Sequence, residues 1–240
     1  MQRKKLFIAN VAALTVIAVV ITVLALNGAG AMETAAENSA IYRGSSEKPN
    51  VTLMFNVYWG TEYIDGILET LEAYGVKTTF FIGGSWAAKN NPSLKAIAAA
   101  GHEIGSHGYN HKDAENLTYD RNIDEMLPAE KLIEEITGTE ITLFAPPSGS
   151  IGEEMFRAAK DLGYTVVMWS RDTVDWRDKN PDLVYTRATS DIRNGELILM
   201  HPTEHTLKAL PKILDFYSEN GFKVVPVSVN IAPPSDGAVK

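Results

Sequence analysis

Two histidines four residues apart, His107 and His111, lie in the stretch GSHGYNH directly after a short apolar run, and His201 ends the apolar run LILMH. The chain has no cysteine, so a transition-metal site would have to use imidazole and oxygen ligands. Histidine pairs at this spacing also arise by chance, but a turn after a strand can bring both rings to one point. His107 and His111 are therefore candidate metal ligands. His201 is a candidate proton donor, because imidazole titrates near neutral pH, or else a hydrogen-bonded core residue.

Two acids and one amide also follow apolar runs. Asp172 and Asp175 lie in the stretch DTVDW, where acids either cap a turn or orient a histidine and stabilise a charged intermediate. Asn56 ends the run LMFN, at a place where a barrel enzyme would position a catalytic carboxylate. All three are candidate catalytic residues, and the amide raises the question of whether the chain performs chemistry.

Aromatic side chains adjoin these candidates. Tyr58 and Trp59 follow the amide, and Trp176 follows the second acid. Tryptophans lie in protein cores by default, but rings that reach the rim of a site suit the apolar faces of sugars. Pro147, in the run APPSG, sets a rigid loop at a further strand end. These four side chains are the candidate substrate contacts.

The apolar runs alternate with amphipathic segments. Seven runs are strand candidates, and most lack a period of two, as expected of strands covered on both faces: 51–55, 78–82, 103–107, 142–145, 165–169, 197–201 and 223–227. Six helical patterns lie between them and end at glycine, a helix stop signal: 61–75, 92–101, 122–138, 152–163, 181–195 and 206–221. This alternation predicts a parallel α/β fold.

A closed or nearly closed barrel is the first expectation for this fold, and an open doubly wound sheet is the second. The open sheet is disfavoured as a nucleotide-binding fold because no glycine-rich phosphate loop follows the first strand. In a parallel barrel the functional site lies beyond the carboxyl ends of the strands. The candidate residues above all follow strand ends.

The first forty residues differ in composition from the rest. Residues 6–26 are almost continuously apolar, and about 21 residues at 1.5 Å each span roughly 30 Å, the thickness of a bilayer core. Three cations, Arg3, Lys4 and Lys5, precede this run and place the N-terminus in the cytoplasm, with the domain on the extracytoplasmic side of a single-pass membrane protein. The alternative is a signal peptide cleaved near AGA at 29–31, which gives a secreted protein.

The expected organisation is a signal-anchor or signal peptide at 1–31, a polar linker at 32–50, one barrel domain at 51–230 and a flexible tail at 231–240. Without the three N-terminal cations the chain keeps 19 basic and 30 acidic residues, a net charge of −11. This charge argues against nucleic acid as a partner.

Together the motifs GHEIGSHGYNH, FAPPSG, WSRDTVDW and LILMHP resemble those of the polysaccharide deacetylases of carbohydrate esterase family 4, in order and in spacing, from about Val51 to Val229. The resemblance implies a distorted (β/α)7 barrel that uses a divalent metal, usually zinc, to remove N-acetyl groups from chitin-like or peptidoglycan sugars. It implies that His107 and His111 bind the metal and that His201 donates a proton to the leaving amine. It also implies that an acid of the DTVDW motif, Asp172 or Asp175, orients an arginine.

Three positions depart from the family pattern. The two adjacent aspartates of the first motif, one a general base and one the third metal ligand, are here Asn56 and Val57, and the arginine of the proline motif is Ala145. Only two of the three usual metal ligands therefore match. Glu62, Asp113, Asp172 and Asp175 are the acids that could substitute.

Two main hypotheses follow. The chain is either a deacetylase of envelope polysaccharide with a rearranged base, or a catalytically impaired relative that binds cell-wall glycan without turnover. A barrel glycosidase with paired carboxylates is a third, weaker alternative. All three give the chain a polysaccharide partner.

Overall fold

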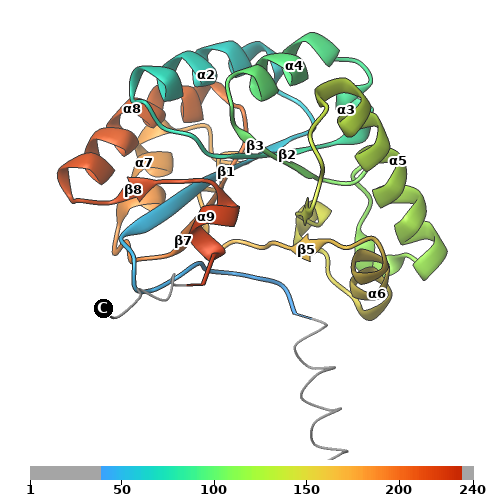
Figure 1. Cartoon of the computed structure of the whole chain (residues 1–240). Helices are drawn as coiled ribbons and strands as arrows, with labels where there is room; N and C mark the ends of the chain where they lie inside the picture. The colour runs from blue at the N-terminus through green and yellow to red at the C-terminus, as the bar shows by residue number, and fades with distance from the viewer. Residues whose placement is uncertain (1–38, 234–240) are drawn as a thin grey trace, which may run out of the picture. The chain divides into compact units, whose positions relative to one another are not determined.

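The computed structural model describes residues 39–233. Within them a parallel sheet curls into a half-barrel, with the strands in the order β5-β4-β3-β2-β1-β7-β6 and with β8 paired to β1 (Figure 1). The strands are β1 (Asn50–Val57), β2 (Thr79–Ile82), β3 (Glu103–Ser106), β4 (Leu143–Phe144), β5 (Thr165–Val166), β6 (Arg171–Asp172), β7 (Glu196–Met200) and β8 (Lys223–Val224). The predicted fold class, a distorted parallel α/β barrel, is confirmed.

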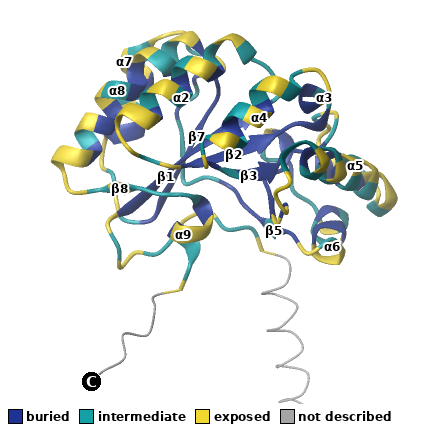
Figure 2. Cartoon of the chain, turned by 45° about the horizontal axis from the view of Figure 1, so that its top comes forward, coloured by how far each residue is buried: buried dark blue, intermediate teal, exposed yellow. Residues whose placement is uncertain are grey.

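Helices cover the outer side of the curled sheet in an arc (Figure 1). They are α2 (Ile64–Ala73), α3 (Gly84–Ala87), α4 (Asn91–Ala99), α5 (Tyr119–Thr137), α6 (Glu153–Asp161), α7 (Pro181–Thr189) and α8 (Glu204–Glu219), while a short α9 (Val227–Ile231) follows β8. Three 3-10 turns complete the described part of the chain: η1 (Thr61–Tyr63), η2 (Ala114–Asn116) and η3 (Pro147–Gly149). Figure 2 shows the central strands β1 and β2 buried and the exposed residues on the outer faces of the helices.

Strand β1 is buried along its whole length, which explains its unbroken apolar sequence. Val51, Leu53, Phe55 and Val57 belong to the larger core cluster, which contains the apolar faces of the helices. Met54 belongs to a smaller cluster with Phe81 and Leu143 on neighbouring strands. Because side chains alternate along a strand, Asn56 points to the same side of the sheet as Met54.

The segment before β1 bridges the two sides of the half-barrel. Ile41 forms a parallel bridge with Val167 beyond β5, and Arg43 forms an antiparallel bridge with Glu196 at the start of β7. The Arg43 guanidinium also pairs with the buried carboxylate of Glu196 at 2.9 Å. This segment, which we expected to be part of a linker, is thus attached to the barrel.

Several element boundaries were wrong. The predicted strand at 165–169 is regular only over Thr165–Val166, and the predicted strand at 223–227 gives way to α9 at Val227. Strand β6 and helix α3 were not predicted at all, because two and four residues carry no measurable periodicity. By contrast, α5 ends as expected at Gly138, whose φ of 71° favours glycine.

Among residues 39–233, no helix is both long enough and apolar enough to cross a bilayer. The apolar segment at 6–26 and most of the tail at 231–240 lie outside the described residues.

Candidate active site

A pocket of about 410 Å³ opens at the carboxyl ends of the strands. Its lining residues come from β1, β6 and β7 and from the segments that follow β1, β3, β4, β5, β6 and β7: Asn56, Tyr58, His107, His111, Ser148, Trp169, Asp172, Trp176, Leu199 and His201. The parallel register places these strand ends at one edge of the sheet, as a barrel site requires. Residues up to 145 positions apart in the sequence, from Asn56 to His201, thus line one cavity.

His201 is held by a buried carboxylate. Its Nδ1 lies 2.8 Å from Oδ1 of Asp175, and its backbone N–H donates to Oδ2 of the same residue at 2.6 Å. The Thr206 hydroxyl, at the start of α8, also donates to Oδ2, at 2.6 Å. Asp175 is 1% exposed and His201 is 5% exposed. Because a carboxylate only accepts, Nδ1 of His201 carries its hydrogen toward Asp175, and Nε2 is left for the ligand.

The aromatic loop after β1 packs against this imidazole. The Trp59 ring stacks on His201 with centroids 5.7 Å apart and planes 8° apart. Trp59 itself is not among the pocket-lining residues, so its contact with a substrate is not supported by position. Its position instead restricts the orientation of the His201 ring.

His107 follows β3 and is 1% exposed. Its Nδ1 lies 2.7 Å from the carbonyl oxygen of Ala145, so Nδ1 carries the hydrogen and Nε2 is the free nitrogen. Burial, with a smaller effect of the neighbouring His111, lowers the pKa of His107 to about 3. The ring is therefore neutral at physiological pH.

His111 takes a left-handed backbone conformation, with φ of 56°, and so turns its ring back toward His107. The two ring centroids are 5.0 Å apart. The Tyr58 ring packs on His111 with centroids 3.9 Å apart and planes tilted by 33°, and it also lies 5.6 Å from the ring of His107 and 6.1 Å from that of His201. Burial lowers the pKa of His111 as well. The structure thus brings the three predicted imidazoles together around one tyrosine ring.

The end of β1 contributes no carboxylate to the pocket. Asn56 is 3% exposed, and its Oδ1 is buried with no hydrogen-bond partner among the described residues. Val57 is fully buried and packs in the larger core cluster. Within residues 39–233, no three side chains of the His, Cys, Asp and Glu types converge as a metal site would need.

Asp172, at the end of β6, is the carboxylate among the lining residues. Its Oδ1 accepts from the backbone N–H of Val174 at 2.7 Å, while Oδ2 has no partner in the described part of the chain. Val174 has a φ of 53°, a rare conformation for a β-branched side chain, which marks local strain at the turn between Asp172 and Asp175. This turn sends one acid into the pocket and the other under His201.

The remaining predicted residues are placed differently. Trp176 lines the pocket and is 52% exposed, as a rim aromatic should be. Pro147 is buried in η3 and does not line the pocket, whereas its neighbour Ser148 does, so the predicted contact by Pro147 is not supported. Glu62 and Asp113, considered as substitute acids, are exposed and lie outside the lining.

Sequence reasoning missed three lining residues, which are Ser148, Trp169 and Leu199. Trp169 was assigned to the core by default, although its place at the end of a predicted strand was a usable signal. For Ser148, whose φ is 56°, no signal in the sequence showed that the loop turns it inward.

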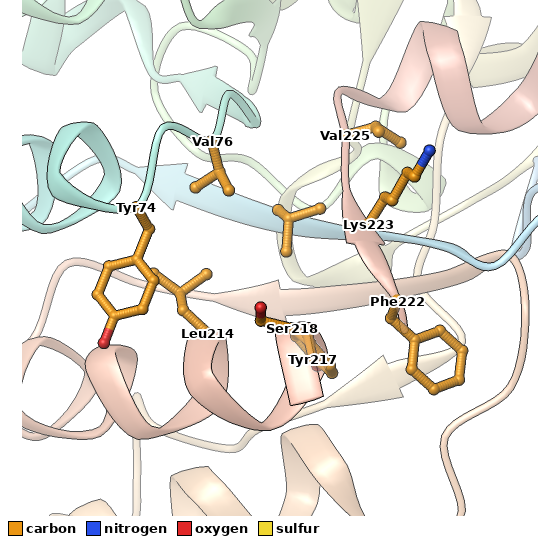
Figure 3. A pocket seen from close by; sticks show the side chains of 9 residues that line it. Tyr74, Val76, Leu214, Tyr217, Ser218, Phe222, Lys223 and Val225 are labelled. Carbon is orange, nitrogen blue, oxygen red and sulfur yellow. The ribbon is translucent and has the colours of Figure 1, made fainter. Parts of the chain in front are cut away.

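A second hollow, of about 370 Å³, lies between α2, α8 and β8 (Figure 3). Its lining is mostly apolar or aromatic, as Tyr74, Leu214 and Phe222 show, and Lys223 is its charged side chain. Val76 precedes β2 and Lys223 begins β8, so this hollow adjoins the amino ends of strands. It holds no histidine or carboxylate among its lining residues and is not a candidate for catalysis.

Comparison with known proteins gives the family. The model of the polysaccharide deacetylase family matches residues 43–167. A peptidoglycan-N-acetylglucosamine deacetylase of Bacillus cereus is 31% identical over 172 residues, which cover 69% of this chain and 80% of that protein. The uncharacterized protein YlxY of Bacillus subtilis is 40% identical over 182 residues, and these span 76% of this chain but only 57% of YlxY.

Among solved structures, a CE4 family pseudoenzyme from Bacillus anthracis superposes with a TM-score of 0.79 at 37% identity, covering 81% of this chain and 69% of that one. The family match, the B. cereus relative and the shared half-barrel agree with the predicted resemblance. The chain therefore belongs to the polysaccharide deacetylases of carbohydrate esterase family 4, a family of hydrolases that includes the peptidoglycan deacetylases.

Proposed function

We propose that this protein binds N-acetylated amino-sugar polysaccharide of the cell envelope, peptidoglycan in particular, and removes its acetyl groups as an impaired deacetylase. The observation that carries the proposal is the pair of His201 and Asp175 at the pocket wall. A proton donor that a buried carboxylate holds in one orientation is what the leaving amine of an amide hydrolysis requires.

A divalent metal is the general cofactor of this family, but the residues present do not fit the usual site. Catalytic zinc normally has three protein ligands. Here two imidazoles, His107 and His111, are joined by no carboxylate, and Val57 stands where the resemblance places the third ligand. No catalytic step is therefore assigned to a metal.

The proposed reaction uses groups that the pocket does contain. Asp172 would activate the attacking water through its unpaired Oδ2, and His201 would protonate the departing amine from Nε2. An amide at position 56 cannot accept the proton that the family's aspartate accepts. Loss of a positioned general base costs about 10²–10⁴ in rate. Turnover should thus be slow even with Asp172 in place.

Sugar rings would lie against the aromatic part of the pocket. Tyr58, Trp169 and Trp176 all contribute to the lining, and Trp176 extends the surface to solvent. Aromatic faces suit the apolar faces of pyranose rings. The pocket volume of about 410 Å³ lies in the range of ordinary ligand sites.

A second candidate function is glycan binding without any turnover. It is favoured by the unpartnered amide of Asn56, by the incomplete ligand set and by the similarity to a protein described as a pseudoenzyme. Both candidate functions predict binding of the same glycan, and only the first predicts release of acetate.

The deciding experiment measures both properties on one sample. The full-length chain is incubated with N-acetylglucosamine pentamer and with peptidoglycan, and acetate release is followed beside sedimentation with the cell wall. We expect the parent protein to bind both glycans and to release acetate slowly. The Asn56→Asp variant should release acetate at least about tenfold faster, because it restores a carboxylate that can act as the general base at the end of β1. Asp172→Asn should abolish the residual release.

The outcomes separate the candidates. Binding with no acetate from the parent, and none from Asn56→Asp, would leave glycan binding as the function. Release of acetate that Asp172→Asn does not change would show that another group is the base. Failure to bind either glycan would overturn both candidates.

We also propose that the domain works outside the cytoplasm, tethered by the apolar segment at 6–26 or secreted after its removal. The proposal is supported by the sequence, in which three cations directly precede the apolar segment. Protease accessibility of the domain in intact spheroplasts would test it, because a cytoplasmic domain would stay protected.

A further inference from the structure

The pocket presents hydrogen-bond acceptors that lack donors. Nε2 of His107 carries no hydrogen, because Nδ1 donates to the Ala145 carbonyl. Oδ1 of Asn56 has no partner, and Oδ2 of Asp172 has none among the described residues. Buried polar atoms are normally paired, so the buried Oδ1 of Asn56, on the same pocket lining as the two other acceptors, indicates that a ligand brings a donor.

The same pocket lacks positive charge. Among the described residues that line it there is no lysine and no arginine. Ala145 stands where the family pattern has an arginine, and its side chain packs in the smaller core cluster. Asp172 is therefore the negative charge of the lining, and the cation that interacts with it, Arg177, lies outside the lining.

Aromatic faces surround these acceptors. Tyr58, Trp169 and Trp176 line the pocket together with them. Such rings attract a ligand cation placed over their faces. Acceptors, a carboxylate and aromatic rings together form a binding site for a small organic cation.

A metal ion is a poor match for this set, because two imidazoles do not complete a catalytic zinc site. An ammonium group is a better match, because it has three donors, a single charge and no fixed coordination geometry. An acetamido group has one N–H and no charge, so it satisfies at most one of the three acceptors.

We propose that the pocket preferentially binds the free amino group of a de-N-acetylated amino sugar, in its ammonium form, with Asn56, His107 and Asp172 as the accepting residues. This inference rests on the proposed glycan binding and names the form of glycan that the site retains. The preferred ligand is then the product that deacetylation leaves in the polymer, whether this protein or another deacetylase forms it.

The test compares two tetrasaccharides that differ only in acetylation, tetra-glucosamine and tetra-N-acetylglucosamine. Each is titrated calorimetrically into the full-length chain at pH 6 with a chelator present. We expect tetra-glucosamine to bind at least about tenfold more tightly, which corresponds to about 1.4 kcal/mol. The preference should shrink at pH 9, where the amine loses its charge.

Matched variants locate the effect. Asp172→Asn should reduce the preference at least about fivefold, since it removes the pocket carboxylate but keeps the shape. Asp120→Asn makes the same change in net charge on the exposed start of α5 and should leave the preference intact, which excludes general attraction to an acidic protein.

Each result has a distinct meaning. Equal or tighter binding of the acetylated tetrasaccharide would overturn this inference and leave the proposed glycan binding standing. A preference that survives Asp172→Asn, or that Asp120→Asn also removes, would overturn the assigned site. Binding of neither sugar would overturn the inference and the proposed function together.

Discussion

The two walls of the pocket differ in how completely their polar atoms are paired. On one wall, the carboxylate of Asp175 accepts from the backbone and ring of His201 and from Thr206, all at 2.6–2.8 Å. On the other, Asn56 keeps a buried oxygen with no partner, and His107 is paired through one nitrogen only. Both oxygens of Asp175 are thus paired without a ligand, whereas the buried oxygen of Asn56 is not paired within the described residues. Substitutions of these two residues should therefore change stability in opposite directions.

The largest effect is expected for Asp175→Ala. This change leaves the donors of His201 and Thr206 buried without an acceptor, so the free energy of unfolding should fall by about 3–5 kcal/mol. Urea denaturation followed by circular dichroism measures it. The control is Asp172→Ala, which removes one backbone contact at a half-buried site and should cost about 1 kcal/mol. Equal losses in the two variants would remove the contrast between the walls.

Acidification should weaken the other wall. Burial lowers the pKa of His107 to about 3, so between pH 6.5 and 3 the unfolded chain binds a proton that the folded chain does not. Stability is therefore complete above about pH 6.5 and is lost as the pH falls toward 3, with an upper limit of about 5 kcal/mol.

The measurement is the free energy of unfolding against pH, in chelator, for the parent and for His107→Gln. The variant should show a flatter curve over this range, because it lacks the titrating group. Parallel curves would mean that His107 does not set the pH dependence. His102, whose pKa burial lowers to about 4, provides a second variant that should flatten the curve by a smaller amount.

A gain in stability is expected for Asn56→Leu. The substitution replaces a buried amide whose oxygen is unpaired by an apolar side chain of similar size, and removing such a group can stabilise a fold by about 1 kcal/mol. Thermal unfolding of the two proteins provides the comparison. Val57→Leu, a change within the larger core cluster, is the control for packing and should be neutral or slightly destabilising. A loss on Asn56→Leu larger than that of the control would show that the amide supports the fold.

The contrast also explains what could be predicted from the sequence. Long strands and helices, such as β1 and α5, follow from apolar pattern and stop signals, since packing selects those residues. The gathering of His107, His111 and His201 was predictable because parallel strands end at one edge.

Short elements and tertiary partnerships were not predictable. Strand β6 is two residues long, which is too short to give a pattern in the local sequence. The sequence allowed an acid of DTVDW to orient a histidine, but that Asp175 rather than Asp172 does so, and that the histidine is His201, came only from the structure. That contact depends on the strained turn at Val174 and on the start of α8, which lies about 30 residues further along the chain.

The smallest expected effect concerns the loop that joins the two walls. The Tyr58 ring packs against His111 and the Trp59 ring stacks on His201, so neighbouring residues of one loop contact both walls. Aromatic pairs of this kind contribute about 0.5–1.5 kcal/mol beyond the area they bury. Trp59→Leu should therefore lower the free energy of unfolding modestly and broaden the His201 ring signals in NMR spectra, while those of His107 stay unchanged. Tyr58→Leu should broaden the His111 signals most, because the Tyr58 ring lies 3.9 Å from that imidazole and 5.6 and 6.1 Å from those of His107 and His201. If either variant broadened the NMR signals of all three imidazoles equally, the loop would couple the two walls. The pocket would then respond to a substitution as one unit, and the contrast between its walls would not hold.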